Sequence, residues 1–285
     1  MSVPASSPKR VVRTRRVNFD YTPATVERHY AQGDLIMSHI VAILSAMFPE
    51  GEDFFVRSVR HYADRITDPD LKEAVAGFTG QETMHGREHR ALNARLQELG
   101  YPTRRVDKLV KFDLARVEKR APHMVQLAIT SALEHYTATL AERLLSSERA
   151  RDMLGEGEVR KVLLWHALEE SEHKAVAFDV YRAMGGTEKM RIRVMRVMTW
   201  SFIFGTTVHT LLSMLADRST YNPVRLGASI KRLTHSPFLG KKMVAAIKDY
   251  NREGFHPNDH DNSELLAHWT KELFGEQGQL VGNLK

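Results

Sequence analysis

Apolar residues recur three and four positions apart along most of this chain, and this spacing places them on one face of an α-helix. From Thr25 to Met47 the pattern predicts an amphipathic helix, which the stretch 48–51, with its proline and glycine, is expected to end. A second helix is expected from Glu50 to Ile66. Glu52 then falls in its first turn, where the helix dipole favours a carboxylate.

Three longer helices are predicted in the middle of the chain. Proline near a helix start and glycine beyond the last turn mark several of their ends. Residues 103–121 are expected to form a connection that contains a short helix. The expected bounds of the three helices are the Asp68-Pro69 start to Leu99, Pro122 to about Ser147, and the turn at Gly155-Glu156-Gly157 to Met184.

The near-continuous helical pattern and the sparse proline predict an all-α protein. Residues 21–186 are expected to form a helical bundle, and residues 187–285 a helical extension packed against it. The first 19 residues are basic, contain no acidic residue and lack the apolar run of a secretory signal. We therefore expect residues 1–20 to be a disordered basic tail, and residues 275–285 to be a loose tail.

The chemistry of the chain is concentrated in two helical segments. His166, Glu170 and His173 stand at positions i, i+4 and i+7, so all three project from one helix face. Glu82 and His85 repeat the Glu-x-x-His spacing of the other segment. Imidazole nitrogens and carboxylate oxygens on one face are metal ligands, and the absence of cysteine excludes thiolate ligation.

Counting residues predicts that the two segments meet. Glu52 lies 16 residues before Asp68, about 24 Å of helix, and Glu82 lies 14 residues after it, about 21 Å, so a hairpin brings the two glutamates level. Glu134 and Glu170 lie at similar distances along the chain from the turn between their helices, so these two glutamates are also expected to meet. A lone Glu on two helices and Glu-x-x-His on two others is the ligand pattern of a four-helix bundle with two metals.

Several of these residues also have a structural interpretation. His166 is either an additional ligand or a buried histidine. The two Glu-x-x-His pairs are either metal ligands or surface carboxylates beside helical histidines. A third pair, Glu253 and His256, adjoins glycine and proline and is interpreted as chance. The neighbouring polar residues are expected to support the ligands, to be solvated or to be structural: His89, His135, Glu169 and Glu172.

Four motifs together resemble a ferritin-like family described as predicted metal-dependent hydrolases. They are Phe48-Pro49-x-Gly51-Glu52, Gln81-Glu82-x-x-His85, Leu133-Glu134-His135 and His166-x-x-Glu169-Glu170-x-Glu172-His173-Lys174, and the resemblance spans about residues 20–255. The His-x-x-x-Glu-x-x-His spacing is also similar to that of di-iron arylamine N-oxygenases. That resemblance implies a ferritin-like bundle and two irons held by Glu52, Glu82, His85, Glu134, Glu170 and His173, with His166 as a seventh ligand.

The expected function is that of a di-iron enzyme that activates dioxygen to oxidise a small, largely apolar substrate. Hard oxygen and nitrogen donors suit iron, with manganese or a mixed manganese–iron pair as the alternative. The alternative function is a metal-dependent hydrolase, in which a bridging water attacks an ester or phosphoester. The sequence leaves open an external electron donor and a homodimer.

The formal charge of +6 raises the question of an anionic partner. The basic runs at 9–16 and 191–196 are interpreted as solvated surface, and no nucleic acid partner is expected because no DNA-binding motif accompanies them. Residues 197–215 carry no formal charge. We expect them to form a buried helix in a cytoplasmic protein; a membrane-docked helix is the alternative and a true span a third. Shorter helices are expected over 222–274.

Overall fold

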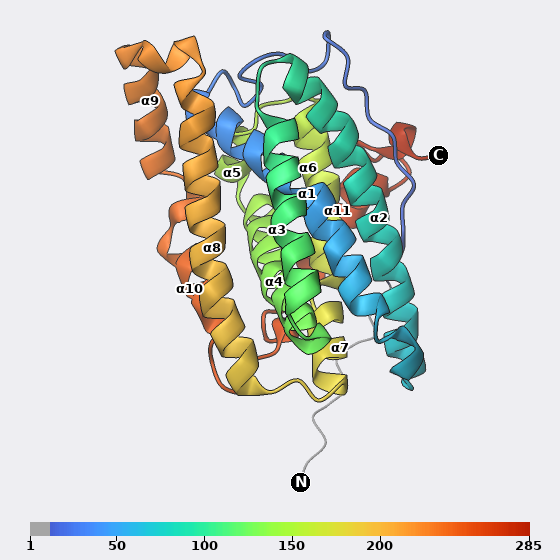
Figure 1. Ribbon diagram of the computed structural model, residues 1–285. Coiled ribbons are helices and arrows are strands. Elements are labelled where there is room, and N and C mark those ends of the chain that lie inside the picture. The colour runs from blue at the N-terminus through green and yellow to red at the C-terminus, as the bar shows by residue number, and fades with distance from the viewer. Residues whose placement is uncertain (1–11) are drawn as a thin grey trace.

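The computed structural model describes residues 12–285, and the regular secondary structure of this part is helical, with one isolated β-bridge (Figure 1). The predicted all-α helical bundle is confirmed. Its central helices are α1 (Leu35–Arg60), α2 (Pro69–Glu98), α4 (His123–Ser146), α6 (Glu158–His173) and α7 (Val176–Ala183).

Two helical pairs make up the bundle. Helix α1 packs against α2, and α4 packs against α6 and α7; α2 also contacts α6 and α7, which joins the pairs. The crossover between them is α3 (Thr103–Arg120), which lies along α1 and is a full helix rather than the expected short one. Helix α2 begins as predicted, because Asp68 caps it and Pro69 occupies its first turn.

Pro49 does not end the first helix, contrary to the prediction. Helix α1 runs through it, and Glu52 lies inside this one helix rather than in the first turn of a second. Proline lacks an N–H, so the carbonyl of Ser45, four residues earlier, loses its helical partner. The Asn93 side-chain amide of α2 donates to that carbonyl at 2.8 Å. A tertiary hydrogen bond thus compensates for the proline. Such a bond cannot be predicted from the residues next to Pro49 in the sequence.

The predicted single helix from residue 157 to Met184 is interrupted. Helix α6 ends at His173, and a turn at Lys174 and Ala175 precedes α7. The Lys174 ammonium donates to the His260 carbonyl in the C-terminal part of the chain. This contact forms between segments far apart in sequence, so the helical pattern alone does not indicate it.

The N-terminal segment is ordered from residue 12 onward, so the expected tail is wrong for residues 12–20; residues 1–11 lie outside the described part. Val17 and Phe19 are buried. The segment crosses α2 over two glycines: a Cβ at Gly77 would lie 2.2 Å from the Val12 carbonyl oxygen, and one at Gly80 would lie 2.0 Å from Thr14 Oγ1. Larger residues at these two positions would displace the segment.

The C-terminal residues are also held, contrary to the expected loose tail. Val17 and Leu284 form an antiparallel bridge, and the Lys285 N–H donates to the Arg16 carbonyl. Leu280 is fully buried. The two ends of the described chain therefore stabilise each other on the bundle.

The remaining helices cover the outside of the bundle. Helix α8 packs on α1 and α4, α10 on α4, and α11 on α6. In Figure 1, α8, α9 and α10 form the left-hand side. Their bounds, with that of the short α5, are α5 Glu148–Asp152, α8 Glu188–Leu215, α9 Pro223–Thr234, α10 Lys241–Asp249 and α11 Ser263–Phe274. Single 3₁₀ turns lie at Ala63–Arg65, Arg218–Tyr221, Pro237–Leu239, Pro257–Asp259 and Val281–Asn283.

Two expectations about the C-terminal part are wrong. Residues 197–215 are not a buried helix, because α8 leaves one apolar face exposed. Arg191, expected on the solvated surface, is fully buried: its guanidinium donates to the carbonyls of Tyr250 and Arg252 and pairs with Glu188. A basic run in sequence does not distinguish its buried members from its exposed ones.

Candidate metal centre

The seven candidate ligands converge in the middle of the bundle from four helices. One group combines Glu52 of α1, His85 of α2 and His166 of α6. A second combines Glu82 of α2 with Glu170 and His173 of α6. In each group the possible ligand atoms lie within 4.8 Å of one another. Glu134 of α4 joins the second group, with Oε2 3.3 Å from His173 Nε2.

Glu170 connects the two groups. Its Oε1 lies 2.9 Å from His166 Nε2, 3.5 Å from His85 Nδ1 and 3.5 Å from His173 Nε2. Oxygens of Glu82 lie 3.9 Å from His85 Nδ1 and 3.0 Å from His173 Nε2. The geometry therefore provides two adjacent donor groups with a carboxylate between them, which is the arrangement that two cations would share.

The donor atoms are buried and largely lack hydrogen-bond partners. All seven residues are at most 5% exposed. Neither carboxylate oxygen of Glu52, Glu82 or Glu134 has a well-formed hydrogen bond, and the same is true of His85 Nδ1 and His173 Nε2. Buried polar atoms without partners are costly and rare in proteins, and buried charges are normally paired or bound to metal. Divalent cations among these atoms would satisfy them.

The carboxyl pKa values indicate the same need for positive charge. Burial and the neighbouring Glu82 raise the pKa of Glu134 to about 8 and that of Glu52 well above its ordinary value. Burial also raises the pKa of Glu170, but His173 and His166 outweigh it and hold that pKa well below normal. Burial lowers the pKa of His166 to about 4, so its imidazole is neutral at pH 7. Burial also lowers the pKa of His85 and His173, but the neighbouring carboxylates outweigh it and raise the pKa of His85 to about 10 and that of His173 well above its ordinary value, so these two must release a proton to bind metal.

A chain of hydrogen bonds orients His166. Its Nδ1 lies 2.7 Å from Nε2 of His89, whose Nδ1 lies 2.8 Å from the Ser45 hydroxyl. That hydroxyl donates to Asn93 Oδ1 at 2.8 Å. If each ring donates outward through Nδ1, His166 Nε2 is free to bind metal. His89, expected to support the ligands or to be solvated, is buried within this chain.

The other two histidines depend on a network that ends at Arg15. His85 Nε2 lies 3.1 Å from Glu169. His173 Nδ1 lies 2.8 Å from Gln81 Oε1, and the Gln81 amide donates to Glu172. The Arg15 guanidinium pairs with Glu169 at 3.1 Å and with Glu172 at 2.6 Å. One cation from the N-terminal segment therefore fixes the outer partners of both histidines.

Sequence reasoning missed Arg15 because it assigned that residue to a disordered tail. The signal that could have indicated it lies in α2, where Gly77 and Gly80 interrupt a helical pattern. Isolated glycines within a helix commonly mark the close approach of another segment. Here that segment is the one that carries Arg15.

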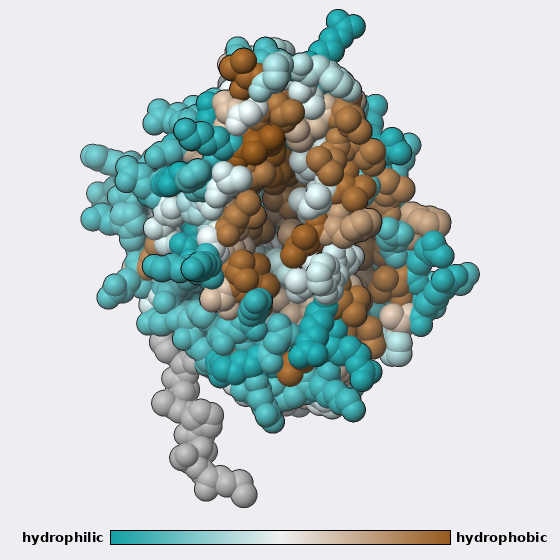
Figure 2. All heavy atoms as spheres, turned by 90° about the vertical axis from the view of Figure 1, so that its left-hand side faces the viewer, coloured by the Kyte–Doolittle hydropathy of each residue, from teal (hydrophilic) through white to brown (hydrophobic). Residues whose placement is uncertain are grey.

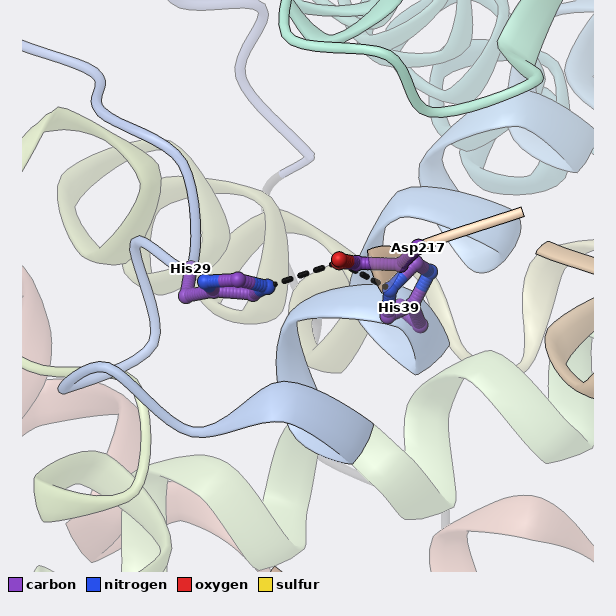
Figure 3. Close-up of side chains that lie close together, drawn as sticks. All are labelled: His29, His39 and Asp217. Carbon is purple, nitrogen blue, oxygen red and sulfur yellow. Dashed lines mark hydrogen bonds and ion pairs between the residues drawn. The ribbon is translucent and has the colours of Figure 1, made fainter. Parts of the chain in front are cut away.

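A third cluster of possible ligands lies outside the bundle centre. Figure 3 shows His29 and His39 pointing at Asp217, with Nε2 atoms 2.8 Å and 3.2 Å from Asp217 Oδ2. Arg28 also pairs with this oxygen at 3.0 Å, and Arg225 lies 3.2 Å from His29 Nδ1. No atom of the three clustered residues lacks a partner, unlike those of the central groups. We therefore interpret this cluster as a structural network that ties the end of α8 to α1.

This network predicts a pH dependence of stability. Burial lowers the pKa of His39 from 6.5 to about 4, so between these values the unfolded chain binds a proton that the folded protein does not. Stability should therefore fall as the pH falls from about 6 to about 4.5, by about 1.4 kcal/mol per pH unit from this residue. Denaturant unfolding of wild type and His39→Gln should give a steeper loss in the wild type. Parallel pH profiles would contradict this assignment.

Two other sequence interpretations agree with the contacts. His256, from the third Glu-x-x-His pair, caps the turn at Pro257–Asp259 and contacts Asp179, and it belongs to neither central group. His135, interpreted as structural, contacts the Ala246 carbonyl through Nε2.

The family model described as "Predicted metal-dependent hydrolase" matches residues 13–261. No curated protein and no solved structure gives a significant match. The match includes Arg15 and every candidate ligand of the two central groups. It confirms the family to which the sequence motifs pointed, whereas the similarity to di-iron N-oxygenases stays a prediction. The chain belongs to the family of predicted metal-dependent hydrolases.

Proposed function

We propose that this protein is an enzyme with a dinuclear metal centre. Glu52, His85 and His166 would hold one cation, and Glu82, Glu134 and His173 would hold the other. Glu170, whose Oε1 faces histidines of both groups, would lie between them. This position of Glu170 among buried donors without partners carries the proposal. The oxygen and nitrogen donors favour iron, with manganese as the alternative.

The protein's own residues exclude water and fix the ligands. Aromatic rings pack on the histidines: Phe48 lies 5.0 Å from His166, Phe78 lies 5.0 Å from His173, and Trp165 lies 4.9 Å from His85, between ring centroids. Outside the aromatic rings, the hydrogen-bond networks that end at Arg15 and at Asn93 set the orientations of the three imidazoles. Such outer contacts tune metal affinity and keep the geometry constant through a reaction.

Two reactions are candidates for this centre. The family description favours hydrolysis, for which bound cations would acidify a water. The geometry favours oxidation by dioxygen, because donors at most 5% exposed among aromatic rings admit a small apolar molecule more readily than an ester or phosphoester. Two ferrous ions, when bound, supply electrons to dioxygen. We propose oxidation of a small, largely apolar substrate as the function, with hydrolysis as the second candidate.

Oxygen uptake distinguishes the two reactions. Protein loaded anaerobically with ferrous iron is expected to consume dioxygen in proportion to the bound iron, faster than the same iron free in buffer. Glu82→Gln should lose this uptake. Turnover of ester or phosphoester substrates without oxygen, combined with no uptake above free iron, would contradict oxidation and support hydrolysis.

A further inference from the structure

The outer face of α8 presents an apolar stripe to solvent. Its inner face, including Met195 and Met214, is buried, and the helix packs on α1 and α4. Along the outer face, large apolar residues follow one another at helical spacing for about five turns. They are at least 48% exposed, with Trp200 at 75% and Phe204 at 70%: Val197, Trp200, Ile203, Phe204, Leu211, Leu212 and Leu215.

The stripe continues onto the next elements. Tyr221, Val224 and Ile230, at and beyond the end of α8, are also strongly exposed. Figure 2 shows brown, apolar side chains gathered on this side of the molecule around a hollow, with teal, polar side chains around them. Isolated exposed apolar residues are common on soluble proteins, but a contiguous patch with a polar rim is typical of an interaction surface. We call this patch, formed by the residues of the stripe with Tyr221, Val224 and Ile230, the α8 face.

The charge around the α8 face is mostly basic. From Glu188 to Asp249, the outer bounds of α8 and α10, the chain holds eleven lysines and arginines and three acidic residues: Asp217 is buried, and Glu188 and Asp249 at the two ends pair with arginines. The exposed basic residues of α8, α9 and α10 are Lys189, Arg193, Arg196, Arg225, Lys231, Arg232, Lys241, Lys242 and Lys248. The surroundings of the apolar patch are therefore basic over three helices.

We propose that the α8 face docks this protein on an anionic lipid membrane. Basic side chains beside exposed tryptophan and phenylalanine are typical of helices that lie in the membrane interface. Anionic headgroups would complement the lysines and arginines while the apolar stripe enters the acyl boundary. A second copy of the chain is disfavoured, because a two-fold contact would place this basic surface against itself.

The docking is peripheral. Among the described residues, the sole helical span long and apolar enough to cross a membrane is Leu35–Arg65, which begins with α1, and its most apolar window is 67% buried within the bundle. Helix α1 also carries Glu52 of the metal centre. The bundle therefore lies outside the bilayer, and α8 contacts the lipid along one side.

Vesicle co-sedimentation of the full chain tests this proposal. Wild type is expected to bind vesicles of phosphatidylcholine with phosphatidylglycerol about tenfold or more better than vesicles of phosphatidylcholine alone. The double variant Trp200→Ser/Phe204→Ser should lose binding to both. Phe112→Ser in α3, where the ring is 59% exposed on another helix, is the matched control and should bind like wild type. Unchanged circular dichroism would show that the double variant folds.

Tryptophan fluorescence reports the contact independently. Of the three tryptophans, Trp165 and Trp269 are buried, so a blue shift on adding vesicles reports Trp200. Absence of sedimentation and of a shift for wild type would overturn the proposal, as would equal binding by the double variant. Dimeric wild type that becomes monomeric through Trp200→Ser/Phe204→Ser, without lipid binding, would overturn it in favour of a second copy.

Discussion

Glu170→Gln is expected to remove both metals from this protein. Its Oε1 faces three candidate histidine ligands, so losing the carboxylate charge weakens both cation positions together. Elemental analysis after loading with ferrous iron or manganese should give close to two metals per chain for wild type and far less for the variant. Glu264→Gln, at an exposed position of α11, is the matched control and should keep the wild-type content. Full occupancy in Glu170→Gln would contradict the assignment.

Glu134→Gln separates metal binding from folding. Since burial and Glu82 raise the pKa of Glu134 to about 8, this carboxyl is mostly protonated at pH 7 without metal, and the amide replaces it closely. The free energy of unfolding of the metal-free protein should therefore change little. Metal at 100 times its dissociation constant stabilises by about 2.7 kcal/mol per site, and the variant should lose part of that gain. A metal-free variant that unfolds would indicate a structural role instead.

Arg15→Ala is expected to weaken metal binding although Arg15 is not itself a ligand. Without the guanidinium, Glu169 and Glu172 lose the cation that fixes them, and through them His85 and His173 lose their orientation. Loss of such outer contacts typically lowers metal affinity by about 10- to 100-fold. Competition with a chromogenic chelator measures this effect directly.

Arg16→Ala is the matched control, because the Arg16 side chain is exposed one position away. It should keep wild-type affinity. Gly77→Leu should act like Arg15→Ala, because its side chain would displace the segment that carries Arg15. Equal affinities for all four proteins would show that the N-terminal segment does not support the centre.

The sequence predicted the helices that are defined by local signals. The Asp68-Pro69 start and the repeated Glu-x-x-His spacing depend on neighbouring residues along one helix, and counting then placed Glu82 level with Glu52. The continuous helix through Pro49 could not be predicted in this way. It depends on the amide of Asn93, which arrives from another helix.

The outer contacts and the exposed surface were harder to predict for the same reason. Gln81 belongs to the motif Gln81-Glu82-x-x-His85, but its hydrogen bond with His173 joins residues 92 positions apart in the sequence, on two different helices. In α8, the absence of formal charge over residues 197–215 predicted an apolar helix without indicating whether the bundle covers it. Both inner and outer faces of that helix are apolar, and only the packing against α1 and α4 distinguishes them.

Anomalous diffraction from crystals of the iron- or manganese-loaded protein tests the central claim most directly. The account predicts two peaks in the bundle, one beside Glu52, His85 and His166 and the other beside Glu82, Glu134 and His173, with Glu170 between them. No peak at these residues, or a single peak at His29, His39 and Asp217, would contradict it.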